Sequence, residues 1–456
     1  MKNDTPHILL VNPWIHDFAA YDFWAKPYGL LQLAAILRSQ GARVSYIDCL
    51  DRFHPKAFNR TDPGARFGRG PYLKTPIPSP SGLHDINRNF SRYGIEPSWF
   101  HSDLRALCPP DLVLVTSLMT YWYPGVHETI GIIKDIFPTA PIVLGGIYAT
   151  LCREHAEQHC RATHVASGAT EKDILKLVSD WTRYDFTGQP VIPNFNPENL
   201  DTFPVPAFDL QRIINYIPLL TSRGCPFDCA YCASKTLYPG YQTRHPETVV
   251  SEIEYWHLKF GVKDFAFYDD ALLVNAETHA IPILENIISL RLPIRFHTPN
   301  AVHIRSITDH TANLMYQAGF KTLRLGLEMY RDSSRENLDG KTTAAEFNCA
   351  VKYLRNAGFS KEQVGAYLLA GLPGQNRLEL EEAIQMVSKC GVSPILAHYT
   401  PIPHTRLWPQ AVASSRYDLT ADPIFTNNAI SPCQKTPFSW EDMSKLKRLA
   451  GNEATQ

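Results

Sequence analysis

The sequence predicts an α/β protein with two consecutive series of strands and helices. In the first series, apolar runs such as Ile8–Val11 and Leu112–Thr116 alternate with amphipathic stretches such as Gly29–Ser39. This alternation is typical of a doubly wound parallel sheet, in which ligands bind at the carboxyl ends of the strands. A second series of six strand–helix units begins at Ile213 and predicts a partial (β/α)6 barrel.

The first domain is expected to span residues 1–185. Its strands are predicted from short apolar runs, and its helices from apolar residues at helical spacing followed by a glycine or proline. The expected strands are Ile8–Val11, Val44–Ile47, Leu112–Thr116 and Ile142–Leu144, and the expected helices are Gly29–Ser39 and Gly125–Ile136.

An irregular stretch from Arg52 to Arg92 interrupts the first series. It carries eight basic residues against two acidic ones and is rich in proline and glycine. A loop of this length inside a compact domain is usually functional or disordered. Its charge fits either a cradle for an anionic ligand or a solvated connector, and the sequence leaves both open.

The barrel is expected to span residues 213–406, after a proline-rich linker at 186–212. A C-terminal extension, residues 407–456, shows weak periodicity and no motif. One barrel helix is predicted over Glu247–Lys259, where apolar residues recur at nearly helical spacing. The six expected barrel strands are Ile217–Thr221, Phe265–Tyr268, Ile294–Thr298, Thr322–Leu327, Gly365–Ala370 and Ile395–Thr400.

Composition argues for an enzyme of a reducing compartment. The 456 residues carry 44 basic and 45 acidic side chains, so nothing in the net charge of −1 points to nucleic acid or an anionic membrane. The ten cysteines are scattered apart from one trio, which is not a disulfide framework. No apolar run is long enough to span a bilayer, and the short polar start leaves no room for a signal peptide. A cytoplasmic location is expected.

The trio is the most informative feature of the chain. Cys225, Cys229 and Cys232 lie within eight residues in a C-x3-C-x2-C pattern. Thiolates at this spacing bind a soft metal centre, either zinc or an iron–sulfur cluster. A closed site wants four protein ligands, so three leave one position for a substrate or cofactor. The alternative is a non-catalytic zinc site whose fourth ligand is His245 or a distant cysteine.

The pattern, with Tyr231 just before its last cysteine, resembles the signature of the radical S-adenosylmethionine (SAM) superfamily. The resemblance implies that the three thiolates hold a 4Fe–4S cluster whose fourth iron is chelated by SAM. One electron then cleaves SAM and releases a 5′-deoxyadenosyl radical, which is chemistry of the cofactor. It also implies an electron donor such as flavodoxin or ferredoxin, and a small-molecule or natural-product substrate.

Further motifs extend the resemblance through the barrel, each at the carboxyl end of a predicted strand. Asp269 and Asp270 resemble the position that takes the amino group of SAM, for which a carboxylate is a suitable acceptor. His404 stands where relatives carry glycine, so the sequence leaves the conformation of that turn open. The residues that the resemblance implies for SAM binding are Tyr231, Asp269, Asp270, Asn300, Glu328 in Gly-Leu-Glu, and Gly371 in Gly-Leu-Pro-Gly.

The first domain resembles the cobalamin-binding modules that precede the barrel in a subset of radical enzymes. The segment Pro27–Gly41 is similar to their first helix, and Gly145-Gly146 follows Ser117 by 28 residues, as in their Ser…Gly-Gly pair. Small residues at two adjacent strand ends open a slot for a bulky ligand. The implied cobalamin-binding residues are Asn12, Ser117, Gly145 and Gly146.

The loop after the first strand departs from the modules that ligate cobalt through histidine. Trp14 stands where that histidine would fall, and His16 is out of register. Cobalamin therefore binds without a protein histidine, with Trp14 or Tyr121 shielding the vacant face, or the module has lost the cofactor. The first alternative predicts a methyltransferase that moves a methyl group from methylcobalamin to an unactivated carbon. The second predicts cobalamin-independent radical cyclisation, oxidation or carbon–carbon bond formation.

Overall fold

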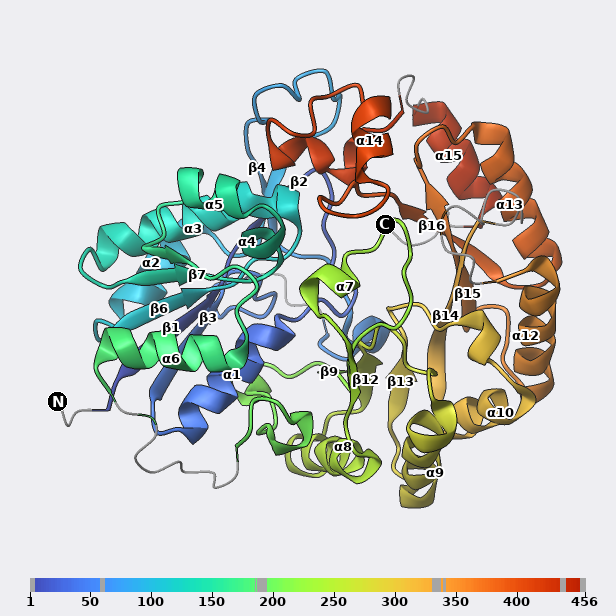
Figure 1. Ribbon diagram of the computed structural model, residues 1–456, viewed down its shortest axis with the longest axis horizontal. Helices are drawn as coiled ribbons and strands as arrows, with labels where there is room; N and C mark the ends of the chain where they lie inside the picture. Colours follow the sequence, from blue (N-terminus) through green and yellow to red (C-terminus); the bar gives the residue numbers. More distant parts are fainter. Residues whose placement is uncertain are drawn as a thin grey trace. The chain divides into compact units, whose positions relative to one another are not determined.

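A computed structural model describes residues 5–57, 62–184, 186, 195–329, 338, 342–434 and 440–451. The chain divides into two compact units (Figure 1). The first comprises Met1–Asn215 together with Asp422–Ile424, and the second comprises Tyr216–Ala421 together with Phe425–Gln456. Arg60 of the basic stretch and residues 187–194 of the expected linker lie outside the described residues.

The first unit is built on a five-stranded parallel sheet in the order β3-β1-β6-β7-β8. The switch in strand order falls between β1 and β6, so the connections that follow these two strands run in opposite directions. The strands are β1 (His7–Asn12), β3 (Arg43–Asp48), β6 (Leu112–Val115), β7 (Ile142–Leu144) and β8 (His164–Val165).

Side chains that alternate along these strands enter two separate cores. Leu9 and Val113 pack with α2 to α5 on one face, whereas Ile8 and Leu112 pack with α1 and α6 on the other. This period of two, with helices on both faces, confirms the predicted doubly wound sheet. The helices are α1 (Tyr28–Ser39), α2 (Pro97–Arg105), α3 (Tyr123–Ile136), α4 (Ile147–Leu151), α5 (Arg153–His159) and α6 (Glu171–Thr182).

The stretch from Arg52 to Arg92, predicted to be irregular, contains two short strands. A three-stranded antiparallel sheet in the order β2-β5-β4 joins it to the loop after β1. Its strands are β2 (Ile15–Asp17), β4 (Lys74–Pro76) and β5 (Ser91–Tyr93). The rest of the stretch is largely irregular, as predicted, and the two strands were missed because three residues are too few to show a readable alternation.

The second unit is built on a six-stranded parallel sheet in the order β16-β15-β14-β13-β12-β9, which confirms the predicted partial barrel (Figure 1). Its strands are β9 (Ile217–Leu219), β12 (Asp264–Phe267), β13 (Arg295–His297), β14 (Phe320–Glu328), β15 (Val364–Ala370) and β16 (Ser393–His398). Its crossover helices are α8 (Pro246–Phe260), α9 (Ala280–Leu290), α10 (Asp309–Gln317), α12 (Ala344–Ala357) and α13 (Arg377–Lys389).

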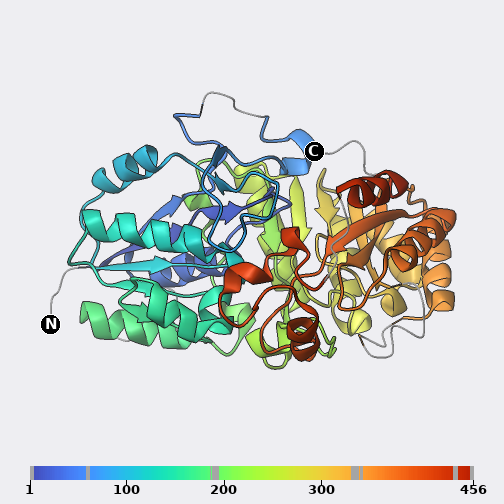
Figure 2. The same ribbon diagram turned by 90° about the horizontal axis from the view of Figure 1, so that it is seen from above.

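A hairpin and three further helices complete this unit. β10 (Ser222–Gly224) pairs antiparallel with β11 (Tyr241–Thr243), and α7 (Ser234–Leu237) lies between them in sequence. In the C-terminal extension, α14 (Trp408–Ser414) is followed by α15 (Trp440–Leu449), which packs on α13 (Figure 2). Within the described part of the chain, no helix has both the length and the apolar character needed to cross a membrane.

Candidate functional site

The cysteine loop begins at a tightly constrained turn. Gly224 ends β10 with φ of +82°, and a Cβ there would lie 2.1 Å from the carbonyl oxygen of Gly240. Only glycine fits such a close approach, so the hairpin fixes where the loop starts. Cys225 and Cys229 are buried, whereas Cys232 is exposed.

Zinc and an iron–sulfur cluster place different demands on the three thiols. No trio of His, Cys, Asp or Glu side chains in the described residues is arranged to hold one metal ion. A zinc ion needs its ligands at about 2.0–2.3 Å from one point. In an iron–sulfur cluster each cysteine binds a different iron, so the sulfur atoms stand apart.

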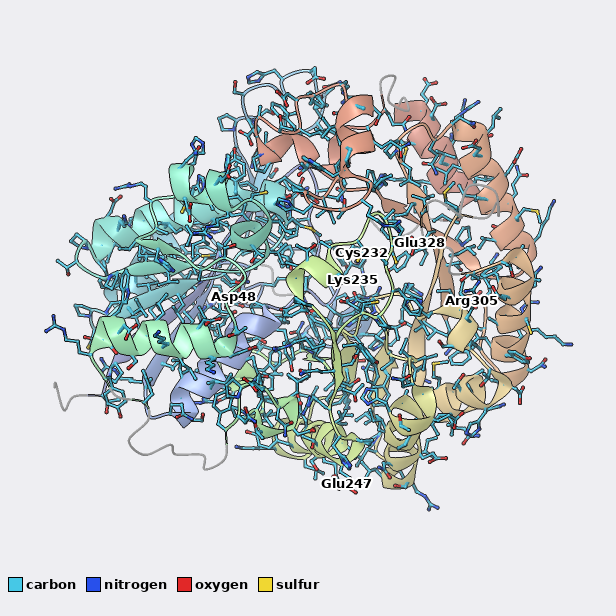
Figure 3. The ribbon with its side chains drawn as sticks, in the orientation of Figure 1. Asp48, Cys232, Lys235, Glu247, Arg305 and Glu328 are labelled. Atoms are coloured by element: carbon cyan, nitrogen blue, oxygen red, sulfur yellow. The ribbon has the colours of Figure 1, made fainter. Side chains whose placement is uncertain are left out.

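Contacts with α7 and with residues 406–407, where the C-terminal extension begins, hold the cysteine loop. Asp228 forms ion pairs with Lys235 at 3.4 Å and Arg406 at 3.3 Å, and the backbone N–H of Leu407 donates to the carbonyl of Ala230 at 2.8 Å. Tyr231 packs against a buried cluster formed by residues of the barrel top and the extension. Figure 3 shows Cys232 and Lys235 where the loop runs into α7.

The two adjacent aspartates after β12 have different surroundings. Asp269 is 3% exposed, and its carboxylate accepts hydrogen bonds from the Thr221 hydroxyl at 2.7 Å, the Thr221 N–H at 3.1 Å and the Ser222 hydroxyl at 2.6 Å. Burial raises the pKa of Asp269 even though these donors oppose the rise. Asp270 is partly exposed and accepts a hydrogen bond from the Ser234 hydroxyl at 2.8 Å.

Asn300 lies exposed after β13 and is held by the neighbouring strand. Its side-chain N–H donates to the carbonyl of Tyr268 at 2.6 Å, and the hydroxyl of Tyr367 donates to the carbonyl of Pro299 at 2.9 Å. The first bond ties the loop after β13 to the carboxyl end of the adjacent β12, and the second ties it to β15, two strands away.

Glu328 ends β14 at a register shift against β15 (Figure 3). Its φ of +61° is in the left-handed region, which costs a residue with a side chain about 1–2 kcal/mol. Strain of this size persists where the surroundings fix the conformation, often at functional positions. Glu328 and Met329 line a cavity of about 390 Å³ whose remaining lining residues belong to α13 or directly precede it.

The glycine turn after β15 is held by two glutamines. Gly371 has φ of +93°, and its N–H donates to Oε1 of Gln375 at 2.7 Å. Gln434 of the extension donates through Nε2 to the carbonyl of Leu372 at 2.9 Å. The sequence gives no local signal for Gln434, because the contact spans 62 residues.

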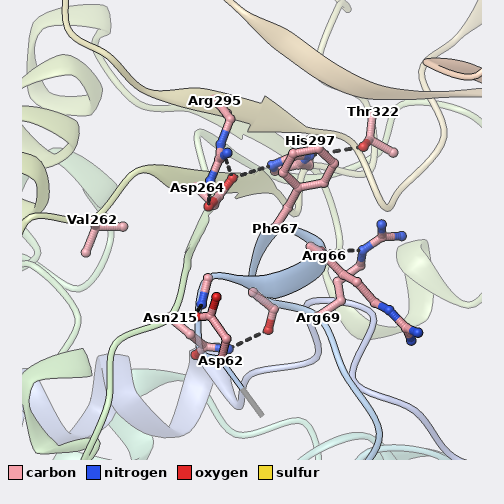
Figure 4. A network of polar contacts seen from close by, with 12 residues as sticks. Asp62, Arg66, Phe67, Arg69, Asn215, Val262, Asp264, Arg295, His297 and Thr322 are labelled. Atoms are coloured by element: carbon pink, nitrogen blue, oxygen red, sulfur yellow. Dashed lines mark hydrogen bonds and ion pairs between the residues drawn. The ribbon is translucent and has the colours of Figure 1, made fainter.

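The barrel interior contains a buried network around His297 (Figure 4). His297 is fully buried and contacts Asp264 at 3.0 Å and Thr322 at 3.1 Å. Asp264 also accepts from Arg295 at 2.8 Å. Burial would raise the pKa of Asp264, but the partners His297 and Arg295 lower it overall.

In the first unit, Ser117 and the glycine pair form one structural element. The Ser117 hydroxyl donates to the carbonyl of Gly145 at 2.7 Å. Gly146 has φ of +92°, and a Cβ there would lie 2.2 Å from the carbonyl oxygen of Ser117. A Cβ on Gly145 would meet nothing within 4 Å, so open space adjoins this edge of the sheet. Asn12, at the end of β1, donates to Asp48 at 2.8 Å.

The prediction that Trp14 or Tyr121 shields an exposed cobalt face does not match their burial. Trp14 is 1% exposed, packs edge-on against Phe100 and donates to the carbonyl of Ile95 at 2.7 Å; Tyr121 is 2% exposed. Both rings belong to the interior of the unit. His16 is also buried, with Nε2 2.8 Å from a carboxylate oxygen of Glu128.

Comparison with known proteins identifies the family of the second unit. Residues 219–387 match the model of the Radical SAM superfamily, a span that contains the cysteine loop and the strand ends described above. Residues 219–387, within the second unit, belong to the radical SAM superfamily.

Two curated relatives give context. An uncharacterised methyltransferase of Pyrococcus horikoshii is 27% identical over 375 residues, which cover 75% of this chain and 78% of the relative. The anaerobic magnesium-protoporphyrin IX monomethyl ester cyclase of Cereibacter sphaeroides is 27% identical over 329 residues, covering 66% of this chain and 53% of the cyclase. The chain therefore spans about half to four fifths of these relatives.

Two solved structures share the fold of both units. The radical SAM methyltransferase TsrM from Kitasatospora setae, with cobalamin and a 4Fe–4S cluster bound, is 17% identical with a TM-score of 0.63, covering 90% of this chain and 78% of TsrM. The cobalamin-dependent radical SAM enzyme OxsB is 14% identical with a TM-score of 0.58, covering 93% of this chain and 58% of OxsB.

Proposed function

We propose that this radical SAM enzyme is a cobalamin-dependent methyltransferase. The observation that carries the proposal is the pairing, in one chain, of the three-cysteine loop with a doubly wound unit whose Ser117–Gly145–Gly146 edge borders open space. The shared fold with TsrM and OxsB, and the named methyltransferase from Pyrococcus horikoshii, support it.

In this proposal Cys225, Cys229 and Cys232 hold the cluster, which together with SAM supplies a 5′-deoxyadenosyl radical. Asp270 is proposed to accept from the amino group of SAM, while Asp269 positions Thr221 and Ser222 at the start of the cysteine hairpin. Glu328, Asn300, Tyr231 and the turn at Gly371 are proposed to line the remainder of the SAM pocket.

The first unit is proposed to hold cobalamin, which supplies the methyl group when bound. Gly145 borders the slot, Gly146 allows the backbone to approach Ser117, and Asn12 orients Asp48 at the neighbouring strand end. The proposed substrate is a small molecule or natural product, and the proposed reductant is a flavodoxin or ferredoxin.

The test is corrinoid retention by anaerobically reconstituted protein. Gly145→Leu starts its side chain in open space, because a Cβ at Gly145 meets nothing within 4 Å, so we expect the fold to survive and hydroxocobalamin to be lost on gel filtration. Gly131→Leu in α3, where the nearest atom to a Cβ lies 4.0 Å away, is the matched control and should retain the corrinoid. If wild-type protein holds no corrinoid, or Gly145→Leu holds as much as wild type, the slot is assigned wrongly.

A second function has one specific observation in its favour. The cyclase of Cereibacter sphaeroides is 27% identical, as is the first methyltransferase named above, although over a shorter span of 329 residues against 375. Radical cyclisation, oxidation or carbon–carbon bond formation without cobalamin is therefore the alternative. Cleavage of SAM with an intact cluster and no corrinoid would favour it.

A further inference from the structure

Ser234 connects a cysteine of the proposed cluster to the carboxylate proposed for SAM. Its hydroxyl oxygen lies 3.2 Å from the sulfur of Cys232 and donates to Oδ2 of Asp270 at 2.8 Å. Its backbone N–H also points to the Cys232 sulfur at 3.4 Å. One short side chain therefore touches both groups.

The Ser234 hydroxyl has a single proton to donate. In the protein without metal, the Cys232 thiol donates to Ser234, and Ser234 donates to Asp270. Iron binds thiolate, so ligation turns the Cys232 sulfur from a donor into an acceptor. Two anionic acceptors, the thiolate and the Asp270 carboxylate, then compete for the same proton.

We propose that Ser234 is a positioning residue that couples SAM binding to the reduction potential of the cluster. When Asp270 accepts from the amino group of SAM, the Ser234 hydroxyl turns from Asp270 to the Cys232 sulfur. A hydrogen bond to a ligand sulfur favours the reduced cluster, because reduction increases the negative charge on sulfur. In this way bound SAM raises the reduction potential of the cluster, so the cluster is easier to reduce when SAM is there to be cleaved.

The proposal rests on the proposed cluster and SAM sites. Thermodynamic linkage between SAM binding and reduction gives the size of the expected effect. Any rise in potential caused by SAM equals a preference of SAM for the reduced over the oxidised enzyme. A tenfold preference corresponds to about 59 mV for one electron. Loss of the one hydrogen bond from the hydroxyl should reduce the preference by about two- to tenfold.

The experiment is a spectroelectrochemical titration of the reconstituted full-length protein with and without SAM. Ser234→Ala removes the hydroxyl but keeps the backbone N–H, whereas Ser234→Thr keeps both. Ser251→Ala, at an exposed position of α8, is the matched control. We expect the shift caused by SAM to shrink in Ser234→Ala and to match wild type in the other two.

A second variant, at Asp270, tests the other partner of the Ser234 hydroxyl. In Asp270→Ala the hydroxyl has only the sulfur to bond, so the potential without SAM should rise. The part of the rise that is lost when Ser234→Ala is combined with Asp270→Ala is due to the hydroxyl rather than to the missing carboxylate charge. A full shift in Ser234→Ala, or an unchanged potential in Asp270→Ala, would overturn the proposal. Loss of the cluster in Ser234→Ala but not in Ser234→Thr would also overturn it, because the hydroxyl would then be structural. Iron and sulfide counts separate these results from failure of the cluster assignment, in which wild type itself holds no cluster.

Discussion

The Asp269 carboxylate accepts hydrogen bonds from both the backbone N–H and the hydroxyl of Thr221, 48 residues away. It thereby joins the end of β12 to the segment between β9 and β10, directly before the cysteine loop. Asp270, the next residue, turns instead to Ser234 in α7. Adjacent aspartates thus serve two different parts of the site.

This relationship predicts different phenotypes for two similar substitutions. Asp269→Asn puts an amide N–H group opposite the donors of Thr221 and Ser222, which now donate to a carboxylate. A buried donor left without an acceptor costs about 1–3 kcal/mol of stability. We expect a lower denaturant midpoint for Asp269→Asn and a nearly unchanged midpoint for Asp270→Asn. Affinity for SAM should fall about tenfold in Asp270→Asn, as for loss of a charged hydrogen bond. If Asp269→Asn weakens SAM binding and Asp270→Asn lowers the denaturant midpoint instead, the two aspartates have each other's role.

A second prediction concerns the three thiols. Replacing Cys225, Cys229 or Cys232 with alanine leaves one iron without its protein ligand, so each variant should lose the cluster and the reductive cleavage of SAM with dithionite. Cys349→Ala, at an exposed position in α12, is the control and should keep four irons per chain. Full cleavage activity in any one of the three variants would show that its thiol is not a ligand.

Local sequence pattern was sufficient for most strands of the two parallel sheets and for the cysteine loop. Buried strands such as His7–Asn12 are continuous apolar runs, and three cysteines in eight residues are a dense local signal. The contacts that organise the site are of another kind. Thr221 with Asp269 and Gln434 with Leu372 pair ordinary polar residues far apart in sequence. Such pairs are created by the fold, so no pattern of one segment indicates them.

The third prediction is that His16 is not a ligand to cobalt. Its Nε2 lies 2.8 Å from a carboxylate oxygen of Glu128. Burial alone would raise the pKa of Glu128, but its interactions with His16 and Arg92 together lower that pKa to about 2. The imidazole therefore already has a carboxylate partner inside the unit. Electron paramagnetic resonance of the Co(II) state should be the same in wild type and His16→Ala. Nitrogen splitting that disappears in His16→Ala would contradict this.

The fourth prediction is a pH dependence of stability from His127. Burial, followed by repulsion from His155 and His159, lowers the pKa of His127 from 6.5 to about 4. Between these two values the unfolded chain is protonated at His127 and the folded chain is not. This contribution to the free energy of unfolding is therefore complete above pH 6.5 and is lost as the pH falls toward 4. Between pH 7.5 and 5 the free energy of unfolding should drop by about 1–2 kcal/mol on this account. Urea unfolding of His127→Gln should show a shallower drop, and an identical slope would show that His127 titrates normally.

The last prediction concerns the turn that the sequence left open. His404 has φ of +67°, the conformation that glycine adopts at low cost, and Thr405 closes the turn by donating through its hydroxyl to the carbonyl of Ile402 at 2.7 Å. A left-handed residue with a side chain is strained by about 1–2 kcal/mol, and a β-branched one by more. Gly gains flexibility in the unfolded chain, which offsets about 0.4–1 kcal/mol of the relief. We therefore expect His404→Gly to be equal to or up to about 1 kcal/mol more stable than wild type, and His404→Val to be less stable. Denaturant midpoints in the order Gly, His, Val would establish the left-handed turn, whereas a Val variant as stable as the Gly variant would rule it out.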